Sequence, residues 1–315
     1  MPAISAKAPA KTILLGEHAV VYGRPAIAVP VHQVYARTVV IADPLAQPDL
    51  IRIEAKDIGL NTYLSDLETD NPFVVAIESI KNKFSLNHLP ASHIVIHSTI
   101  PRSAGLGSSA AVAVSLIRAY TTFLGLQPSA QEVSELAYEV EKVQHGTPSG
   151  IDNTVIAFET PIVFQKNHLI RLLQVGSPLT LLIADSGIPG STKEALTIVR
   201  ERWQSAPDLY EQYFDQIAGY VTDATEKIRI GDLNSLGNLM TQNHAVLQQI
   251  GVSSPELDRF VDNALENGAL GAKMCGGGLG GNMIALVKTE SVDTISNNLF
   301  ILGAKSIICT TVKNN

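Results

Sequence analysis

Residues 101–111, which read PRSAGLGSSAA, have the residue types of a phosphate-binding turn. A strand-like run at residues 93–98 precedes them, and an alanine-rich helical run follows at about residues 109–123. Free amides at a helix N-terminus point outward, and the helix dipole favours negative charge there. Gly105 and Gly107 let the backbone close around oxygen atoms, and a serine hydroxyl can reach a metal ion. An ordinary small-residue helix start explains the same pattern, so the segment alone favours the two interpretations equally.

A second glycine cluster lies at residues 275–281, CGGGLGG, with five glycines in seven residues. Glycine loses much conformational freedom on folding, so such a loop indicates backbone that approaches something closely. A tight turn or bulge is the alternative, but one or two glycines are enough for that. The cluster therefore favours a loop that faces a ligand.

Neither cluster has the spacing of a common nucleotide motif. A Walker motif requires a lysine that is absent after Gly107, and Ala110 stands where a dinucleotide fingerprint has its third glycine. The spacing therefore excludes a P-loop and argues against a Rossmann-type oxidoreductase.

Several charged residues lie in or beside predicted strands, helices and loops, where they could carry out chemistry. Lys11 begins an apolar run, and Glu17 and His18 end it. For Lys11, the simpler interpretation is a side chain that reaches water from a strand edge. For Glu17 and His18, it is a pair of polar side chains whose hydrogen-bonding needs are met within the protein. Glu141 lies near the edge of the apolar face of a predicted helix, where a surface ion pair is the default. Asp152 is expected in a turn-rich loop, where acids form turns but catalytic groups also concentrate.

Composition narrows the class of protein. The 315 residues suffice for one large or two ordinary domains, and 45% apolar with 17% charged residues fits a globular chain. The net charge of −7 gives no basic footprint for nucleic acid. Two cysteines, Cys275 and Cys309, exclude a disulfide framework and a cysteine-based zinc cluster.

Neither an export signal nor a membrane segment is recognisable in the chain. The N-terminus holds only a three-residue apolar run before charged residues, too short for a signal-peptide core. No stretch approaches the roughly 18–20 apolar residues that span a bilayer. We expect a cytoplasmic protein with no membrane partner.

The pattern of apolar residues predicts a mixture of strands and helices without strict alternation, which indicates an α+β fold. A capping box, Ser129 with Glu132, begins the helix that ends near His145. A composition change around residue 176 marks the expected domain boundary. The other predicted helices cover residues 72–84, 109–123, 192–204, 208–230, 233–250, 255–267 and 291–300. The predicted strands cover residues 11–15, 25–41, 51–54, 93–98, 179–183, 283–288 and 304–312.

Three motifs together resemble the GHMP kinase superfamily. Motif one is residues 8–23 (APAKTILLGEHAVVYG), motif two is residues 101–111, and motif three is residues 273–282 (KMCGGGLGGN). Their order and spacing span almost the whole chain. Within the superfamily, GEHAVVYG of motif one and residues 141–152 resemble the mevalonate kinases most closely, as does Ser-Thr-Lys at residues 191–193.

The resemblance implies a kinase that transfers the γ-phosphate of ATP to the 5-hydroxyl of (R)-mevalonate. Another GHMP kinase, with phosphomevalonate or a sugar as acceptor, is the alternative, and a catalytically silent protein on the same fold is a third. The implied fold has an N-terminal domain of the ribosomal S5 domain 2 type (residues 1–176) and a ferredoxin-like C-terminal domain (residues 177–315). ATP is expected in the cleft between them, and the protein is expected to form a homodimer.

The resemblance also implies roles for the nucleotide-binding residues. Ser109 and Glu141 would hold Mg²⁺, a hard cation that prefers oxygen ligands. The residues expected to wrap the ATP phosphates are Ser103, Ala104, Gly105, Leu106, Gly107, Ser108 and Ser109.

For the transfer step, Asp152 would accept the proton of the substrate hydroxyl, and Lys11 would neutralise developing charge and keep Asp152 ionised. Glu17, His18 and Thr192 would position mevalonate.

Motif three departs from the family pattern, which often begins Thr-Gly-Ala-Gly-Gly-Gly-Gly. Cys275 is a poorer hydrogen-bond donor than threonine, and Leu279 is expected to narrow the loop or change its mobility.

Overall fold

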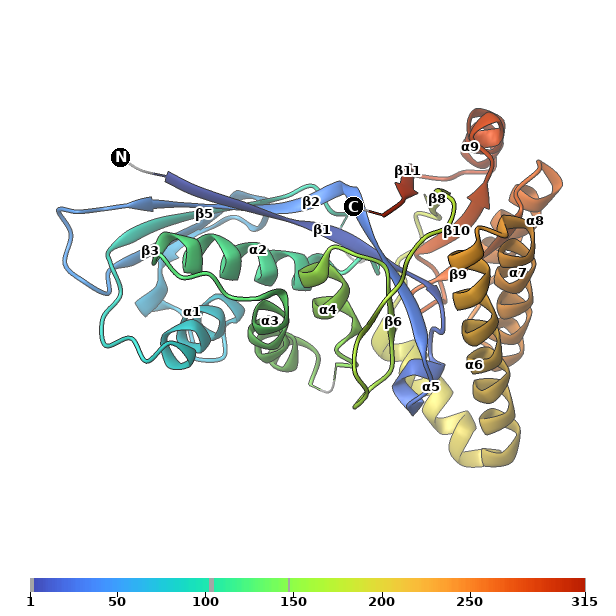
Figure 1. The fold of residues 1–315 in the computed structure, drawn as a ribbon, viewed down its shortest axis with the longest axis horizontal. Coiled ribbons are helices and arrows are strands. Elements are labelled where there is room, and N and C mark those ends of the chain that lie inside the picture. Colours follow the sequence, from blue (N-terminus) through green and yellow to red (C-terminus); the bar gives the residue numbers. More distant parts are fainter. Residues whose placement is uncertain (1–2, 102–104, 147, 315) are drawn as a thin grey trace. The chain divides into compact units, whose positions relative to one another are not determined.

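The computed structural model describes residues 3–101, 105–146 and 148–314 (Figure 1). Its contacts divide the chain into two compact units. Unit 1 consists of Met1–Ala10, Val34–Ile100 and Gly107–Glu159. Unit 2 consists of Lys11–Gln33, Pro101–Leu106 and Thr160–Asn315. Each unit is therefore built from separate stretches of sequence.

The sheet strands of unit 1 follow from short alternating sequences. In β3 (Ile51–Ala55) every second residue is buried, as expected for a strand with one face on a core. β3 pairs in parallel with β5 (Ser92–Ser98) and antiparallel with β4 (Leu60–Tyr63). β5 pairs antiparallel with the second half of β2 (Ala26–Ala42), and β1 (Ala3–Leu15) also pairs with β2.

Side-chain caps begin two of the described helices of unit 1. The Asn71 side chain accepts a hydrogen bond from the amide of Phe73 at the start of α1 (Pro72–Lys83). Ser129 and Glu132 form the predicted capping box of α3 (Ala130–His145). α2 (Ser108–Phe123) is buried on most of its circumference because it packs against α1, α3 and α4 (Ile151–Phe158).

Unit 2 contains an antiparallel sheet in the order β11-β8-β10-β9. The sequence of β8, its helices, β9, β10, α9 (Val292–Ile301) and β11 gives the βαββαβ pattern of a ferredoxin-like domain. The inner strands are continuous apolar runs because both neighbours and helices cover them. The sheet strands are β8 (Leu179–Asp185), β9 (Gly271–Cys275), β10 (Asn282–Val287) and β11 (Ser306–Val312).

Four helices connect β8 to β9 in this unit (Figure 1). α7 and α8 pack against β9, and α6 packs against α7. Their bounds are α5 (Thr192–Ser205), α6 (Pro207–Ile230), α7 (Leu233–Ile250) and α8 (Pro255–Glu266). The first half of β2 pairs with β6 (Ile162–Phe164), which pairs with β7 (Arg171–Leu172).

Short 3₁₀ turns complete the two units, and the turn within motif one is held firmly in unit 2. Tyr22 of η1 (Ala19–Tyr22) stacks on Phe214 of α6 with ring centroids 4.3 Å apart. Arg24 Nε donates to Asp215 Oδ1 at 2.9 Å. The remaining turns are η2 (Lys56–Ile58), η3 (Leu64–Asp66) and η4 (Thr289–Ser291).

The α+β prediction is confirmed, and the predicted helices agree with the structure to within a residue or two. The prediction of a loop at Asp152 is wrong, because Asp152 lies in the first turn of α4. Pro148 and Gly150 are turn residues, so the sequence around them predicts a loop and gives no signal for the eight-residue helix that follows. The strands β4, β6, β7 and β9 were also not predicted. A single domain boundary at residue 176 stays a prediction.

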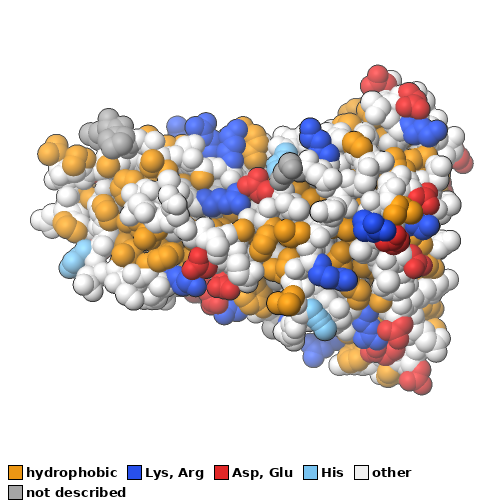
Figure 2. Space-filling model, in the orientation of Figure 1, with side chains coloured by type: hydrophobic (Ala, Val, Ile, Leu, Met, Phe, Trp, Pro, Cys, Tyr) orange, Lys and Arg blue, Asp and Glu red, His pale blue; other side chains and the backbone are white. Residues whose placement is uncertain are grey.

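Acidic and basic side chains are interspersed over the face that Figure 2 shows. Within the described ranges, no helix combines the length and the apolar composition that crossing a membrane requires.

Helix α7 lies so close to β9 that Gly237 is predicted to be required. A Cβ at Gly237 would lie 2.1 Å from the carbonyl oxygen of Leu270, which is backbone and cannot move aside. We expect Gly237→Ala to lower the free energy of unfolding by about 1–3 kcal/mol through overpacking, measured by urea denaturation. Gly219→Ala in α6 is the control, because a Cβ there meets nothing within 4 Å. It should be neutral or stabilising, and equal losses in both variants would contradict the packing argument.

Candidate active site

Motif one turns sharply where β1 ends. Gly16 has φ +105°, and a Cβ on it would lie 2.5 Å from Ala26 Cα, so only glycine fits there. His18 also has a positive φ, 60°. The turn places Glu17 and His18 in the interior of unit 2, where they are 1% and 4% exposed.

Glu17 is held by a buried cation. Lys273 of β9, which is fully buried, donates from Nζ to Glu17 Oε1 and to the carbonyl of Met274. Burial raises the pKa of the Glu17 carboxyl, and the charge of Lys273 opposes that rise. The second carboxylate oxygen, Oε2, is buried and has no hydrogen-bond partner among the described residues.

His18 contacts the glycine loop of motif three. Its Nε2 lies 3.0 Å from the carbonyl oxygen of Gly277. Burial lowers the pKa of His18 to about 4, so the imidazole is neutral at pH 7 and its Nε2–H donates to that carbonyl. His18 therefore acts as a neutral hydrogen-bonding group.

Cys275, near the beginning of motif three, contacts motif one through its thiol. Its Sγ lies 2.8 Å from Thr12 Oγ1 and 3.7 Å from the carbonyl oxygen of Ile13. Burial raises the pKa of the Cys275 thiol, so it stays protonated at neutral pH. The thiol thus keeps a polar link between β9 and β1.

Much of the glycine content in motif three serves internal packing. A Cβ would lie 2.7 Å from Thr192 Cα at Gly277, 2.0 Å from the Val252 carbonyl oxygen at Gly278, and 2.7 Å from the Ile188 carbonyl oxygen at Gly280. The sequence predicts that the backbone of this loop approaches something closely. At these three positions it approaches other residues of the same chain.

Leu279 attaches the same loop to the core of unit 2. It adopts φ 60°, its amide donates to the Val252 carbonyl at 2.8 Å, and its side chain packs against the core of unit 2. The Gly281 amide donates to the Ile188 carbonyl at 2.8 Å. Leu279 thus anchors the loop.

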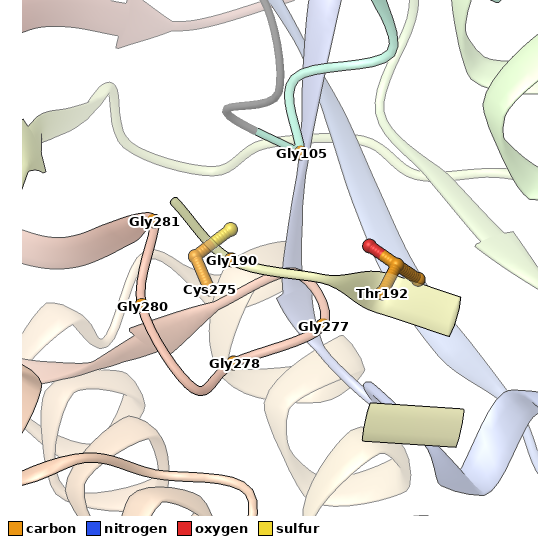
Figure 3. Close-up of a pocket in the computed structure, with 8 residues that line it drawn as sticks. All are labelled: Gly105, Gly190, Thr192, Cys275, Gly277, Gly278, Gly280 and Gly281. Carbon is orange, nitrogen blue, oxygen red and sulfur yellow. The ribbon is translucent and has the colours of Figure 1, made fainter. Parts of the chain in front are cut away.

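A small pocket lies between two glycine segments of unit 2 (Figure 3). A Cβ on Gly105 would lie 3.6 Å from Gly276 Cα, so the two backbones face each other without side chains between them. Figure 3 shows the Cys275 thiol and the Thr192 hydroxyl directed toward the side where Gly105 lies. Such a backbone-lined space, with amides and small polar groups, suits an anion.

Lys11 lies beside this segment in β1. Its amide donates to the Leu106 carbonyl at 3.0 Å, which ties motif one to motif two. Lys11 is 4% exposed, so the alternative in which it reaches water is wrong.

The predicted metal ligands meet in unit 1. Gly107 (φ 71°) precedes α2, and the Ser109 hydroxyl of its first turn lies within hydrogen-bond distance of Glu141 Oε1 and of Gln144. Glu141 is 3% exposed, and His145 Nε2 lies 3.7 Å from Glu141 Oε2. A hydroxyl and a carboxylate are the hard oxygen ligands that Mg²⁺ takes, so these residues fit that ion.

The residues next to Asp152 in α4 attach this helix to α3 of unit 1. Asn153 Nδ2 donates to the Ser134 carbonyl of α3 at 2.9 Å, and Thr154 Oγ1 lies 3.2 Å from Ser134 Oγ. Asp152 is half-buried in the first turn of α4. Its backbone is thus fixed against α3, the helix that carries Glu141.

The predicted site residues therefore form two groups. Gly107, Ser108, Ser109, Glu141 and Asp152 belong to unit 1, and Lys11, Glu17, His18, Gly105, Leu106 and Thr192 belong to unit 2. Ser103 and Ala104 lie outside the described residues.

Sequence reasoning missed two residues. Lys273 stands in the otherwise apolar run 272–275, and a single lysine there signals a buried acidic partner. Gln144 follows Glu141 at helical spacing, which signals that the two share a face.

Comparison with known proteins decides the family. Residues 71–160 match the family "GHMP kinases N terminal domain", and residues 224–304 match "GHMP kinases C terminal". The mevalonate kinase of Thermococcus sibiricus is 37% identical over 97% of this chain and 95% of its own. The chain belongs to the mevalonate kinase family. The mevalonate kinase of Pyrococcus furiosus is also 37% identical, over 97% of this chain and 95% of its own.

Solved mevalonate kinases have the same fold as this family member. The L. major enzyme in complex with R-mevalonate aligns with a TM-score of 0.84 and 27% identity, over 99% of this chain and 96% of its own. The Methanococcus jannaschii enzyme aligns with a TM-score of 0.85 and 27% identity, over 100% of this chain and 99% of its own.

The neutral buried His18 makes stability depend on pH. Its pKa is about 4 when folded and near 6.5 when unfolded, so between those values the unfolded chain binds more protons. Stability should fall as pH drops from 7 to 4, by up to about 3 kcal/mol from this group. In His18→Asn, which tolerates the positive φ, urea unfolding should show a shallower fall over the same range. An unchanged slope would contradict the assignment.

Proposed function

We propose that this protein transfers the γ-phosphate of ATP to the 5-hydroxyl of (R)-mevalonate. The observation that carries the proposal is the near full-length similarity to named mevalonate kinases, together with the presence of Lys11, Ser109, Glu141 and Asp152. Phosphoryl transfer requires mainly positioning and charge stabilisation, which backbone loops and a few charged groups can supply.

In this proposal the nucleotide phosphates bind at backbone amides. Gly107 leads into α2, whose first amides have no partner within the helix and whose dipole favours an anion. Gly105 and Leu106 of motif two would contribute further backbone groups. Ser108 is half-buried beside them, so its hydroxyl is available to a phosphate oxygen.

Mg²⁺ is the proposed metal of this reaction. Ser109 and Glu141 would hold it, and Gln144 Oε1 would accept a hydrogen bond from the Ser109 hydroxyl. The ion would supply charge neutralisation for the phosphates when bound.

Asp152 and Lys11 are the proposed groups for the transfer itself. The Asp152 carboxylate would orient the acceptor hydroxyl and take its proton, while the Lys11 ammonium would stabilise negative charge on the transferred group. Lys11 is buried, which strengthens its electrostatic effect compared with an exposed lysine.

Mevalonate recognition is assigned to Thr192, Glu17 and His18, in two different ways. Thr192 begins α5, is exposed and lines the pocket of Figure 3, so its hydroxyl can contact a ligand. Glu17 and His18 are buried and already contact motif three, so they would act by holding it. A homodimer and a cytoplasmic location stay predictions.

Purified protein should release ADP only when Mg²⁺, ATP and (R)-mevalonate are all present. A coupled ADP assay with a panel of acceptors tests this, and the panel should include phosphomevalonate, galactose and homoserine. Because phosphomevalonate carries an extra phosphate, its use would require further cations at the acceptor site. ADP release with another acceptor, and none with mevalonate, would overturn the proposal.

Asp152→Asn removes the proposed proton acceptor at nearly constant shape. We expect kcat to fall about 10²-fold or more, while the KM for ATP changes little. Asp293→Asn is the matched control, since Asp293 also lies in a helix first turn but has no proposed role. Near wild-type turnover in Asp152→Asn would show that another group serves Asp152's role.

A further inference from the structure

Lys273 of motif three has no role in the proposed reaction, although its burial is energetically expensive. Its side chain is fully buried within β9, a strand whose other residues are also buried. An ammonium group removed from water is strongly destabilising unless it is paired and hydrogen-bonded. Its contacts with Glu17 and the Met274 carbonyl supply that pairing.

The ion pair is one of several polar links between motif one and motif three. Lys273 and Cys275 alternate along β9, so the strand presents them on one side, and Gly277 lies in the loop two residues after the strand ends. They contact Glu17, Thr12 and His18 respectively. Motif one is thus attached to β9 and to the beginning of the glycine loop at regular intervals.

This attachment determines where the glycine loop lies. Gly277 accepts from His18, packs against Thr192 and lines the pocket, and its neighbour Gly276 lies close to Gly105. Because Glu17 and His18 are adjacent, a shift of Glu17 relative to Lys273 would move His18 and, with it, the Gly277 carbonyl.

We propose that Lys273 is a positioning residue for phosphoryl transfer, acting through Glu17 and His18 to hold residues 276–281 against the pocket. This rests on the proposed function. Lys273 touches no ligand in this role, since it is fully buried. We call Glu17, His18, Lys273 and the Gly277 carbonyl the motif-three clamp.

The charge of Lys273 also favours the ionised form of its partner. Burial raises the pKa of Glu17, and Lys273 is the largest influence in the opposite direction. Without Lys273 the carboxyl would be an uncompensated buried group, and its pKa would rise further. Loss of the lysine therefore removes one charge of the pair and makes the other, Glu17, harder to ionise.

A purely stabilising ion pair makes a different prediction from a positioning one. Removing one partner of a buried pair is strongly destabilising, whereas replacing both is often neutral. If Lys273 only stabilises the fold, Glu17→Gln combined with Lys273→Met should restore both stability and activity. If Lys273 positions the loop, the double variant should recover stability without recovering activity.

The experiment compares Lys273→Met, the Glu17→Gln/Lys273→Met double variant and Ile295→Ala. Ile295 is fully buried in α9 of the same unit, so its truncation destabilises without touching the clamp. Thermal unfolding, kcat and KM for both substrates, and calorimetric binding of ADP with Mg²⁺ are measured for each. The binding measurement needs no turnover, so it tests the clamp even if mevalonate is not the acceptor.

We expect Lys273→Met to lose thermal stability and the double variant to regain most of it. Both should show kcat reduced by about tenfold or more, since small displacements of positioning groups are costly, and both should bind ADP more weakly. Ile295→Ala should lose stability alone. A double variant with wild-type kcat and ADP affinity would overturn the proposal. If Lys273→Met does not fold, the double variant decides the result by itself.

Discussion

A buried ion pair between Glu17 and Lys273 is the interaction on which the rest of the unit 2 site depends. Two charges removed from water are tolerated only in a narrow geometry, so the turn after β1 has one position relative to β9. The positive φ of Gly16 and His18 is the local condition for that position. The contact of His18 with Gly277 follows from it.

The site uses backbone more than side chains. The segments that face the pocket in unit 2 are glycine-rich, and in unit 1 the helix α2 begins directly after Gly107. Phosphoryl transfer suits such a design, because the transition state needs charge stabilisation and alignment and little covalent chemistry. Ser109, Glu141, Asp152 and Lys11 add the few groups that backbone cannot provide.

Local signals in the sequence were sufficient for much of this. Gly107 before α2 and the Ser129–Glu132 box before α3 are features of neighbouring residues, and the structure has both. Pairing across the chain left no such signal: Glu17 and Lys273 are separated by 256 positions. The glycines of motif three were correctly linked to close approach, but Gly278 approaches Val252 because of tertiary packing that no local pattern encodes. Asp152 was misplaced because a short helix followed strong turn residues.

Amide hydrogen exchange in residues 276–281 tests most directly whether the ion pair holds the glycine loop. The amides of Leu279 and Gly281 donate to Val252 and Ile188, so their exchange reports the loop's position. In the Glu17→Gln/Lys273→Met variant, exchange at these two amides should accelerate about tenfold or more, while amides of β10 keep their wild-type rates. Unchanged exchange at Leu279 and Gly281 would contradict the account, because the loop would then be held without the pair.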